Sequence, residues 1–206
     1  MLNRQVCMRV AGIVLCGGQS RRMGRSKAWL PFGPELMLPR VVRLLRETVR
    51  PVLVVAAAGQ DLPPLPGDVP IIRDARAERG PLEGLAAGLN ALRNQADAVY
   101  LSSCDVPLLR PAFVRRLIDL LGEYMACAPQ TDGRSHPLAA VYRLGVCDKV
   151  QQLLAADRLR LSALLDEVPT RFVTAEELAA VDPGLESLRN VNTVEEYQAA
   201  LRLLSA

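Results

Sequence analysis

Aromatic residues, paired cysteines and long apolar runs are all scarce in this sequence. Aromatic side chains make up only 4% of the 206 residues, although half of the residues are hydrophobic. The five cysteines are widely spread and form no C-x-x-C pair, so neither a zinc ribbon nor a disulfide framework is expected. We also expect no signal peptide and no transmembrane helix, because no apolar stretch is suited to either. These absences favour a cytoplasmic protein whose core is built from valine, leucine and alanine.

Net charge is low as well. The sequence has 25 basic and 22 acidic residues, which leaves a net charge of +3. Nucleic-acid-binding proteins usually carry a broader basic surface, so we expect no nucleic acid among the partners, and no membrane. The basic residues instead concentrate between residues 21 and 27, which favours a small anionic ligand. Histidine occurs once, as His136, and a lone histidine is more often structural than catalytic.

Strand-like and helix-like segments alternate along the first 124 residues. The hydrophobic patterns predict strands at 10–15, 52–57, 69–72 and 98–103, and helices at 38–49, 82–92 and 112–121. Such alternation is typical of a mostly parallel sheet with helices on both faces, an α/β fold in three layers. Further on we expect strands at 125–128, 138–142, 171–173 and 188–191, and helices at 146–156, 175–180 and after the capping box of Thr193 and Glu196. The prediction is one domain over 1–206, with its C-terminal third extending the same sheet.

The most informative segment is the loop at 16–27, which follows the apolar run Ile13 to Leu15. It contains Gly17, Gly18 and Gly24 together with four cations, which are Arg21, Arg22, Arg25 and Lys27. Glycines let backbone N–H groups approach a ligand closely and cations neutralise its charge, so the loop is predicted to hold a phosphate chain. It is neither a Walker A loop nor a dinucleotide fingerprint. A solvated basic turn is the alternative.

Three further polar clusters follow predicted strands. They are Asp74, the segment C-D-V-P at 104–107 and the segment N-V-N-T at 190–193. Ligands of open parallel sheets bind beyond the carboxyl ends of the strands, so we expect these clusters to converge. Asp105 suits a hard cation such as Mg²⁺, which prefers oxygen ligands; a turn or cap aspartate is the alternative. Asp74 has the same position but could be an ion-pair partner of neighbouring arginines.

Two features remain open on the sequence alone. Glycines at 80, 84 and 88 flank or enter a predicted helix, and they could either pack that helix closely or let the 80–82 backbone line a planar base. Cys16 and Cys104 flank the predicted site. Small buried residues are the default interpretation for both, because nothing nearby indicates a nucleophilic thiolate.

The loop L-C-G-G-Q-S-R-R-M-G-R-S-K at 15–27 resembles the signature L-A-G-G-x-S-x-R-M-G-x-x-K of nucleotidyltransferases that make activated cofactors and sugars. Further matches, in the same order, are similar to the molybdenum cofactor guanylyltransferases. They are I-I-R-D at 71–74, G-P-L-E-G-L at 80–85, C-D-V-P at 104–107, H-P-L-A-A at 136–140 and N-V-N-T at 190–193.

The resemblance implies a Rossmann-like nucleotidyltransferase fold, with a nucleotide-binding part at about 8–123 and an acceptor-binding part at about 124–206. It implies GTP and molybdopterin as substrates and Mg²⁺ as cofactor. The residues implied to contact the nucleotide are Leu15, Cys16, Gly17, Gly18, Lys27, Asp74, Gly80, Pro81, Leu82 and Asp105. Asp105 would also hold Mg²⁺, and Asn190 and Asn192 would face the pterin acceptor or the metal.

Three positions bear on base choice and affinity. Related cytidylyltransferases usually have alanine in place of Gly17 and C-D-Q-P at the acidic motif, so Gly17 and Val106 favour guanine. Cys16 replaces the usual alanine of the loop. Relatives often carry an asparagine at the end of the second strand, where this chain has alanines and a glycine, so Gln60 is the candidate substitute.

The implied reaction is attack by the terminal phosphate of molybdopterin on the α-phosphorus of GTP, with release of pyrophosphate. A phosphate monoester has its second pKa near about 6, so no general base is needed. Lys27 and Arg22 would stabilise charge on the leaving group, beside Mg²⁺ on Asp105. The alternatives are a sibling transferase using CTP or a sugar phosphate, and a GTP-binding adaptor without turnover. Cofactor-insertion proteins and molybdoenzyme maturation chaperones are the expected protein partners.

Overall fold

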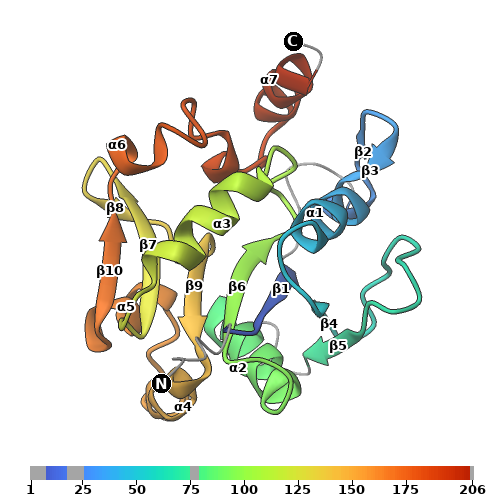
Figure 1. The fold of residues 1–206 in the computed structure, drawn as a ribbon. Coiled ribbons are helices and arrows are strands. Elements are labelled where there is room, and N and C mark those ends of the chain that lie inside the picture. Colours follow the sequence, from blue (N-terminus) through green and yellow to red (C-terminus); the bar gives the residue numbers. More distant parts are fainter. Residues whose placement is uncertain (1–7, 18–25, 75–78, 205–206) are drawn as a thin grey trace, which may run out of the picture.

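A twisted central sheet organises the chain (Figure 1). The structure is a computed structural model that describes residues 8–17, 26–74 and 79–204. The strand order across the sheet is β10-β7-β9-β6-β1-β4-β5, with β8 paired to β7. Their bounds are β1 Val10–Cys16, β4 Val52–Ala57, β5 Ile71–Asp74, β6 Ala98–Ser103, β7 Ala126–Thr131, β8 Arg134–Ser135, β9 Ala140–Arg143 and β10 Thr170–Val173.

Most neighbouring strands of this sheet run parallel. Strand β1 pairs in parallel with β4 and β6, and β4 pairs in parallel with β5. Strand β9 is inserted antiparallel to both β6 and β7, and β10 returns parallel to β7. The predicted mostly parallel α/β sheet is therefore confirmed, and the strands after residue 124 join it.

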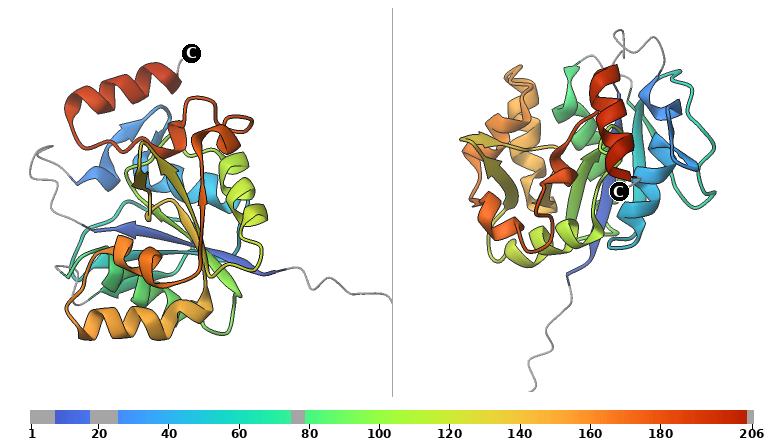
Figure 2. Two further views of the ribbon diagram at one scale, coloured as in Figure 1. Left: turned by 90° about the vertical axis from the view of Figure 1, so that its left-hand side faces the viewer. Right: turned by 90° about the horizontal axis from the view of Figure 1, so that it is seen from above.

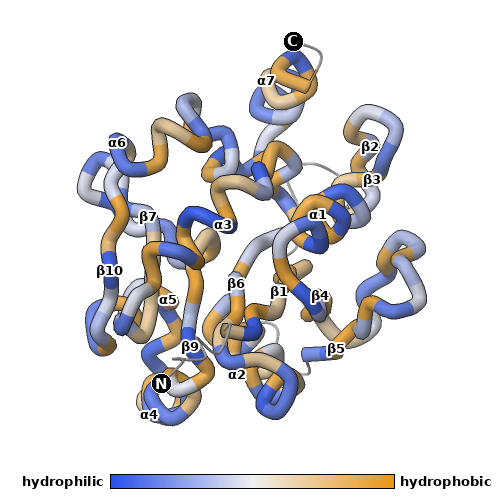
Figure 3. Tube along the Cα trace, in the orientation of Figure 1, coloured by the Kyte–Doolittle hydropathy of each residue, from blue (hydrophilic) through white to orange (hydrophobic). Residues whose placement is uncertain are grey.

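Helices cover both faces of the sheet, which confirms the three-layer prediction (Figure 2). One face packs against α1 (Met37–Arg46), α3 (Pro111–Leu120) and α6 (Ala175–Leu178). The other packs against α2 (Pro81–Leu92), α4 (Cys147–Ala155) and α5 (Leu161–Glu167). Helices α1 and α4 each contain both hydrophobic and hydrophilic residues, as expected for helices that bury one side and expose the other (Figure 3). Within the described residues, none of the helices has the length and apolarity needed to cross a membrane.

A small satellite unit lies above the carboxyl end of the sheet. The hairpin of β2 (Pro31–Phe32) and β3 (Glu35–Leu36) follows the 3₁₀ helix η1 (Lys27–Trp29). Phe32 packs edge-to-face on Tyr197 of α7 (Val194–Leu204), with ring centroids 6.4 Å apart. This packing holds the C-terminal helix beside the segment that follows the glycine-rich loop.

The expected strand at 188–191 is wrong. A 3₁₀ helix, η4 (Glu186–Leu188), ends there, and the following residues form no strand. Val191 is buried, but its N–H donates to the carbonyl of Asp105 at 2.8 Å rather than to a neighbouring strand. An apolar residue such as Val191 can be buried in a strand or in a loop that is held by a single hydrogen bond, and the sequence does not distinguish the two.

Candidate active site

A pocket of about 800 Å³ lies at the carboxyl ends of β1, β4, β5 and β6. The convergence expected of the polar clusters is found here. Among the sequence-predicted residues, the pocket is lined by Leu15, Cys16, Gly17, Lys27, Asp74, Gly80, Pro81, Asp105 and Asn192. Leu82 is instead buried in the core, and Asn190 lies beside the lining as a partner of Asp105. Gly18 and Arg22 lie outside the described residues.

The polar centre of the pocket is formed by Lys27, Asp105 and Asn192. The Lys27 Nζ donates to Asp105 Oδ2 at 2.8 Å and to Asn192 Oδ1 at 2.5 Å. The other carboxylate oxygen of Asp105 accepts from Ser103 Oγ at 2.5 Å and from Asn190 Nδ2 at 3.3 Å. The side chains of Lys27 and Asp105 are only 16% and 13% exposed, so water screens their attraction weakly.

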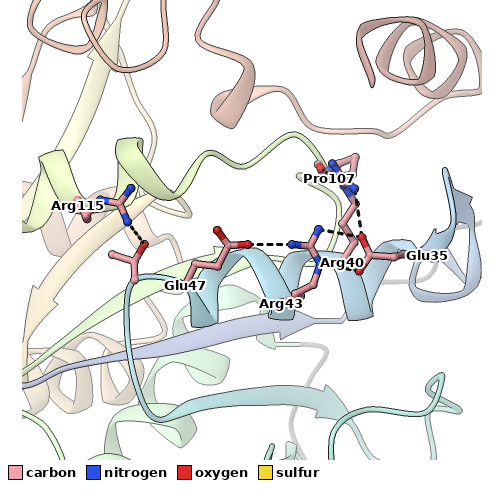
Figure 4. Close-up of polar contacts among 7 residues, drawn as sticks. Glu35, Arg40, Arg43, Glu47, Pro107 and Arg115 are labelled. Atoms are coloured by element: carbon pink, nitrogen blue, oxygen red, sulfur yellow. Dashed lines mark hydrogen bonds and ion pairs between the residues drawn. The ribbon is translucent and has the colours of Figure 1, made fainter. Parts of the chain in front are cut away.

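Helix α1 holds the C-D-V-P segment in place (Figure 4). Arg40 donates from Nε to the carbonyl of Pro107 at 2.7 Å, and its Nη1 pairs with Glu35 at 3.2 Å. Hydrogen bonds from Arg43 lower the pKa of Glu35, which keeps this carboxylate ionised. Asp105 therefore extends from a strand end that is fixed by both the sheet and α1.

The 190–193 segment is fixed over the pocket by the start of α7. The Glu196 carboxylate accepts from the backbone N–H groups of Asn192 at 2.6 Å and Thr193 at 3.0 Å. The N–H of Glu196 in turn donates to Thr193 Oγ1 at 3.2 Å, which confirms the predicted capping box. Together with the bond from Val191 N–H to Asp105, this cap positions the Asn192 side chain toward Lys27.

Cys16 and Cys104 form part of the pocket floor, where they are 1% and 8% exposed. A hydrogen bond with Cys104 lowers the pKa of the Cys16 thiol, whereas the same contact and burial raise the pKa of the Cys104 thiol. Gln60 donates from Nε2 to Cys16 Sγ at 3.5 Å, and its Oε1 accepts from Ala57 N–H at 3.2 Å. Gln60 thus caps the end of β4 and reaches the pocket, where it was expected to substitute for an asparagine.

The glycines around the start of α2 include both pocket-lining and packing positions, while contact of the 80–82 backbone with a base stays a prediction. Gly80 has a φ of +86°, caps α2 and lines the pocket together with Gly84. A Cβ on Gly88, by contrast, would lie 2.6 Å from Ile13 Cδ1, so this glycine serves close packing of α2 on β1. Gly84 shares both roles, because it lines the pocket and a Cβ there would lie 3.0 Å from Leu15 Cδ2 on β1.

Ser103, Leu138 and Glu196 line the pocket but were not predicted as site residues. A serine just before C-D-V-P was the only sequence signal for Ser103. His136 directly follows β8, and its Nε2 is 2.7 Å from Oγ1 of Thr131 at the end of β7. Burial lowers the pKa of His136, which fits its structural interpretation.

A family model described as a MobA-like NTP transferase domain matches residues 12–171, most of the chain. The chain belongs to the MobA-like NTP transferase family. A probable molybdenum cofactor guanylyltransferase of Mycobacterium avium is 39% identical over 197 residues, covering 93% of this chain and 95% of its own. A relative of the same name from Mycobacterium marinum is 37% identical over 204 residues, covering 94% of both chains. The resemblance inferred from the loop and the later motifs is confirmed.

Solved structures show that the MobA-like chain has a nucleotidyltransferase fold. Molybdopterin-guanine dinucleotide biosynthesis protein A from Archaeoglobus fulgidus superposes with a TM-score of 0.77 at 20% identity, covering 95% of this chain and 98% of that one. The 2-C-methyl-D-erythritol 4-phosphate cytidylyltransferase of Thermus thermophilus superposes with a TM-score of 0.72 at 16% identity, covering 97% and 100%. The expected Rossmann-like nucleotidyltransferase fold is confirmed, and the likeness concerns the fold alone.

The donor set of this MobA-like site is compatible with Mg²⁺. Mg²⁺ at phosphate sites is usually held by one or two carboxylates, with substrate phosphates and waters completing the shell. Asp105 offers such a carboxylate at the pocket wall, and Asn192 Oδ1 offers a neighbouring amide oxygen. Within the described part of the chain, no three His, Cys, Asp or Glu residues gather into a metal cage. The residues therefore suit a cation that arrives with a nucleotide rather than one held by protein alone.

Proposed function

We propose that this protein transfers GMP from GTP to the terminal phosphate of molybdopterin, with release of pyrophosphate, in a Mg²⁺-dependent reaction. The family assignment and the names of the mycobacterial relatives support this proposal. The observation that carries it is the Lys27–Asp105–Asn192 cluster at the pocket centre. It combines a cation for phosphates, a carboxylate for a metal, and an amide for the acceptor side.

In the proposed reaction, Lys27 exchanges its bonds to Asp105 and Asn192 for bonds to phosphate oxygens. A lysine ammonium has three donors, so it can contact the phosphate chain while keeping one protein partner. Asp105 would hold Mg²⁺, which when bound neutralises negative charge on the phosphates. The acceptor phosphate is already largely ionised at neutral pH, so the site needs no general base. The contribution of Arg22 stays a prediction, because this residue lies outside the described residues.

The pocket volume of about 800 Å³ suits a nucleotide. We place the guanine against the wall formed by Leu15, Gly17, Gly80 and Pro81, with Asp74 nearby. Asn190 and Asn192 then face the acceptor. In this arrangement Leu82 supports the base-binding backbone from within the core, where its side chain is fully buried.

The decisive test measures pyrophosphate release from GTP with molybdopterin as acceptor and Mg²⁺ present. Lys27→Met and Asp105→Ala should each lower kcat by about 100-fold or more, the loss typical of removing a group that stabilises charge in the transition state. Lys149→Met and Asp148→Ala are matched controls on α4 and should keep wild-type turnover. Near-normal turnover of Asp105→Ala would contradict the metal-binding role of Asp105. Unchanged pyrophosphate release by Lys27→Met would mean that the positive charge of the loop contributes to binding only and not to catalysis.

Base choice needs a separate comparison, because the cytidylyltransferase of Thermus thermophilus has nearly the same fold similarity as the guanine-named protein. A sibling activity with CTP or a sugar phosphate is therefore the second candidate. We expect kcat/KM with GTP to exceed that with CTP by about 100-fold, a ratio that a few hydrogen bonds to the base can supply. Preference for CTP would favour the second candidate. Tight GTP binding without pyrophosphate release under any acceptor would indicate a non-catalytic adaptor.

The cytoplasmic location and the proteins that deliver or receive the cofactor stay predictions. A labile acceptor favours direct transfer from cofactor-insertion proteins to this chain, and from it to maturation chaperones of molybdoenzymes. Co-purification of such proteins with the full chain would identify the partners.

A further inference from the structure

Cys16 and Cys104 lie opposite each other on neighbouring parallel strands. Leu15 of β1 pairs with Ser103 of β6, and the N–H of Cys104 continues the ladder by donating to the carbonyl of Leu15 at 3.0 Å. Neighbouring strands are about 4.8 Å apart, so directly opposed residues have a similar Cα separation. Disulfide-bonded cysteines usually have Cα atoms about 4.4–6.8 Å apart. The ladder therefore places the two residues at a separation that a disulfide can span.

The two thiols also point to the same side of the sheet. Cys16 and Cys104 belong to one core cluster, on the face covered by α1 and α3. Both are free thiols in this structure. The Gln60 amide contacts Cys16 Sγ from the direction of β4, which restricts the rotation of this side chain. Bond formation would thus need only small side-chain rotations.

The pocket gives small molecules access to this pair. Both cysteines line the pocket, although each residue is almost fully buried. Cys127 is 0% exposed on β7 and does not line the pocket, and Cys147 lies on the far α4 layer. A neutral oxidant the size of water could reach Cys16 and Cys104 from the pocket, whereas packed side chains shield Cys127. Among the cysteines that the structure describes, Cys16 and Cys104 are therefore the pair expected to form an intrachain disulfide.

We propose that Cys16 and Cys104 form an oxidisable dithiol that hydrogen peroxide converts to a disulfide across the pocket floor. Cys16 Sγ attacks one peroxide oxygen, the O–O bond breaks, and the departing hydroxide takes the thiol proton to give water. Cys104 Sγ then attacks the resulting sulfenic sulfur, the S–S bond forms and the S–O bond breaks. The second hydroxide leaves as water with the Cys104 proton. Two thiols and one peroxide thus yield one disulfide and two waters.

The disulfide is expected to weaken nucleotide binding, a consequence that rests on the proposed function. Cys16 directly precedes Gly17, and Cys104 directly precedes Asp105. Drawing the two sulfurs together would shift both neighbours and remove the thiol that Gln60 contacts. We expect GTP affinity to fall by about tenfold or more, equivalent to about 1.4 kcal/mol, and to recover when a thiol reductant cleaves the bond.

The test treats the full chain with hydrogen peroxide, blocks the remaining thiols, and maps disulfide-linked peptides by mass spectrometry. The expected product is a peptide pair joining Cys16 to Cys104, which disappears in Cys16→Ala and in Cys104→Ala. Cys127→Ala is the matched buried control and should give the same linked pair as wild type. Prior incubation with GTP should slow formation of the pair, because the nucleotide would cover the pocket floor.

The outcomes test separately whether the disulfide forms and whether it weakens nucleotide binding. Absence of the Cys16–Cys104 peptide in wild type, or oxidation that stops at sulfinic acid on one cysteine, overturns the dithiol. A linked pair with unchanged GTP affinity overturns its effect on the nucleotide site. If the reduced protein itself fails to bind GTP while the linked pair forms, the proposed function fails and the dithiol stands, so the two failures are distinguishable.

Discussion

Replacing Gly88 by alanine tests whether α2 is packed as closely on the sheet as the structure indicates. An ideal Cβ at this position would lie 2.6 Å from Cδ1, 3.0 Å from Cγ1 and 3.1 Å from Cγ2 of Ile13. Ile13 is 0% exposed on the central strand β1, and its β-branched side chain has few alternative rotamers. The added methyl group therefore cannot be accommodated unless the helix or the isoleucine moves.

Two opposing terms set the size of the effect. Alanine is favoured over glycine inside a helix by about 1 kcal/mol, which stabilises the variant. Overpacking a dense core usually costs about 1–3 kcal/mol. Because the new methyl group would lie close to three atoms of one buried side chain, we expect a cost near the upper end of that range. We therefore expect Gly88→Ala to lower the free energy of unfolding by about 2 kcal/mol.

The assay is equilibrium unfolding in urea, followed by circular dichroism. A second variant, Ile13→Val, removes the Cδ1 atom that comes closest to the new methyl group. In that background Gly88→Ala should be less destabilising by about 1 kcal/mol, because the two residues are in direct contact. A Gly88→Ala variant as stable as wild type would refute the close packing, and an unchanged loss in the Ile13→Val background would refute its assignment to Ile13.

Three further predictions concern polar contacts that hold elements of the fold in place. Hydrogen bonds from Arg43 lower the pKa of Glu35, so its contribution should be present at neutral pH and lost as the pH falls through that lowered pKa. Glu35→Gln should therefore lower the free energy of unfolding by about 1 kcal/mol at pH 7 and by much less once the pH is below the lowered pKa of Glu35, and equal losses under both conditions would contradict this. Asp182 is 0% exposed and accepts from the backbone N–H of Ser187 at 2.8 Å, so Asp182→Ala should cost about 3 kcal/mol in thermal or urea unfolding. Thr193→Ala removes the N-cap of α7 and should cost about 1 kcal/mol, while proteolysis should reveal faster cleavage near the C-terminus than in wild type.

Strong local patterns made much of the fold predictable. The apolar runs at 10–15 and 98–103 became β1 and β6, and the helix expected at 82–92 became α2 with Pro81 in its first turn. The site could be located because parallel strands end at one edge of a sheet, so polar residues just after each strand must converge there. Asp74 and Asp105 both line the pocket for this reason.

Weaker patterns misled or gave no signal. The stretch at 188–191 has apolar residues only at its two ends, Leu188 and Val191, and its buried valine bonds to Asp105 rather than to a sheet neighbour. The helix α5 (Leu161–Glu167) and the capping box of Thr174 and Glu177 were not anticipated. The capping box is a local motif, so the sequence T-x-x-E at 174–177 did contain a signal for it.

The sequence by itself determined which residues could act and on which edge of the sheet they would lie, because hydrophobic period and strand-end position are local properties. Only the tertiary structure decided which of them meet. Lys27 reaches Asp105 and Asn192, 78 and 165 residues away along the chain, because η1, β6 and α7 pack around one pocket. It also showed that Gly88 packs α2 on β1, that Gly80 lines the pocket and that Gly84 does both, since these roles depend on distances between α2 and β1. Long-range distances of this kind arise from the packing of whole elements, so short motifs do not specify them.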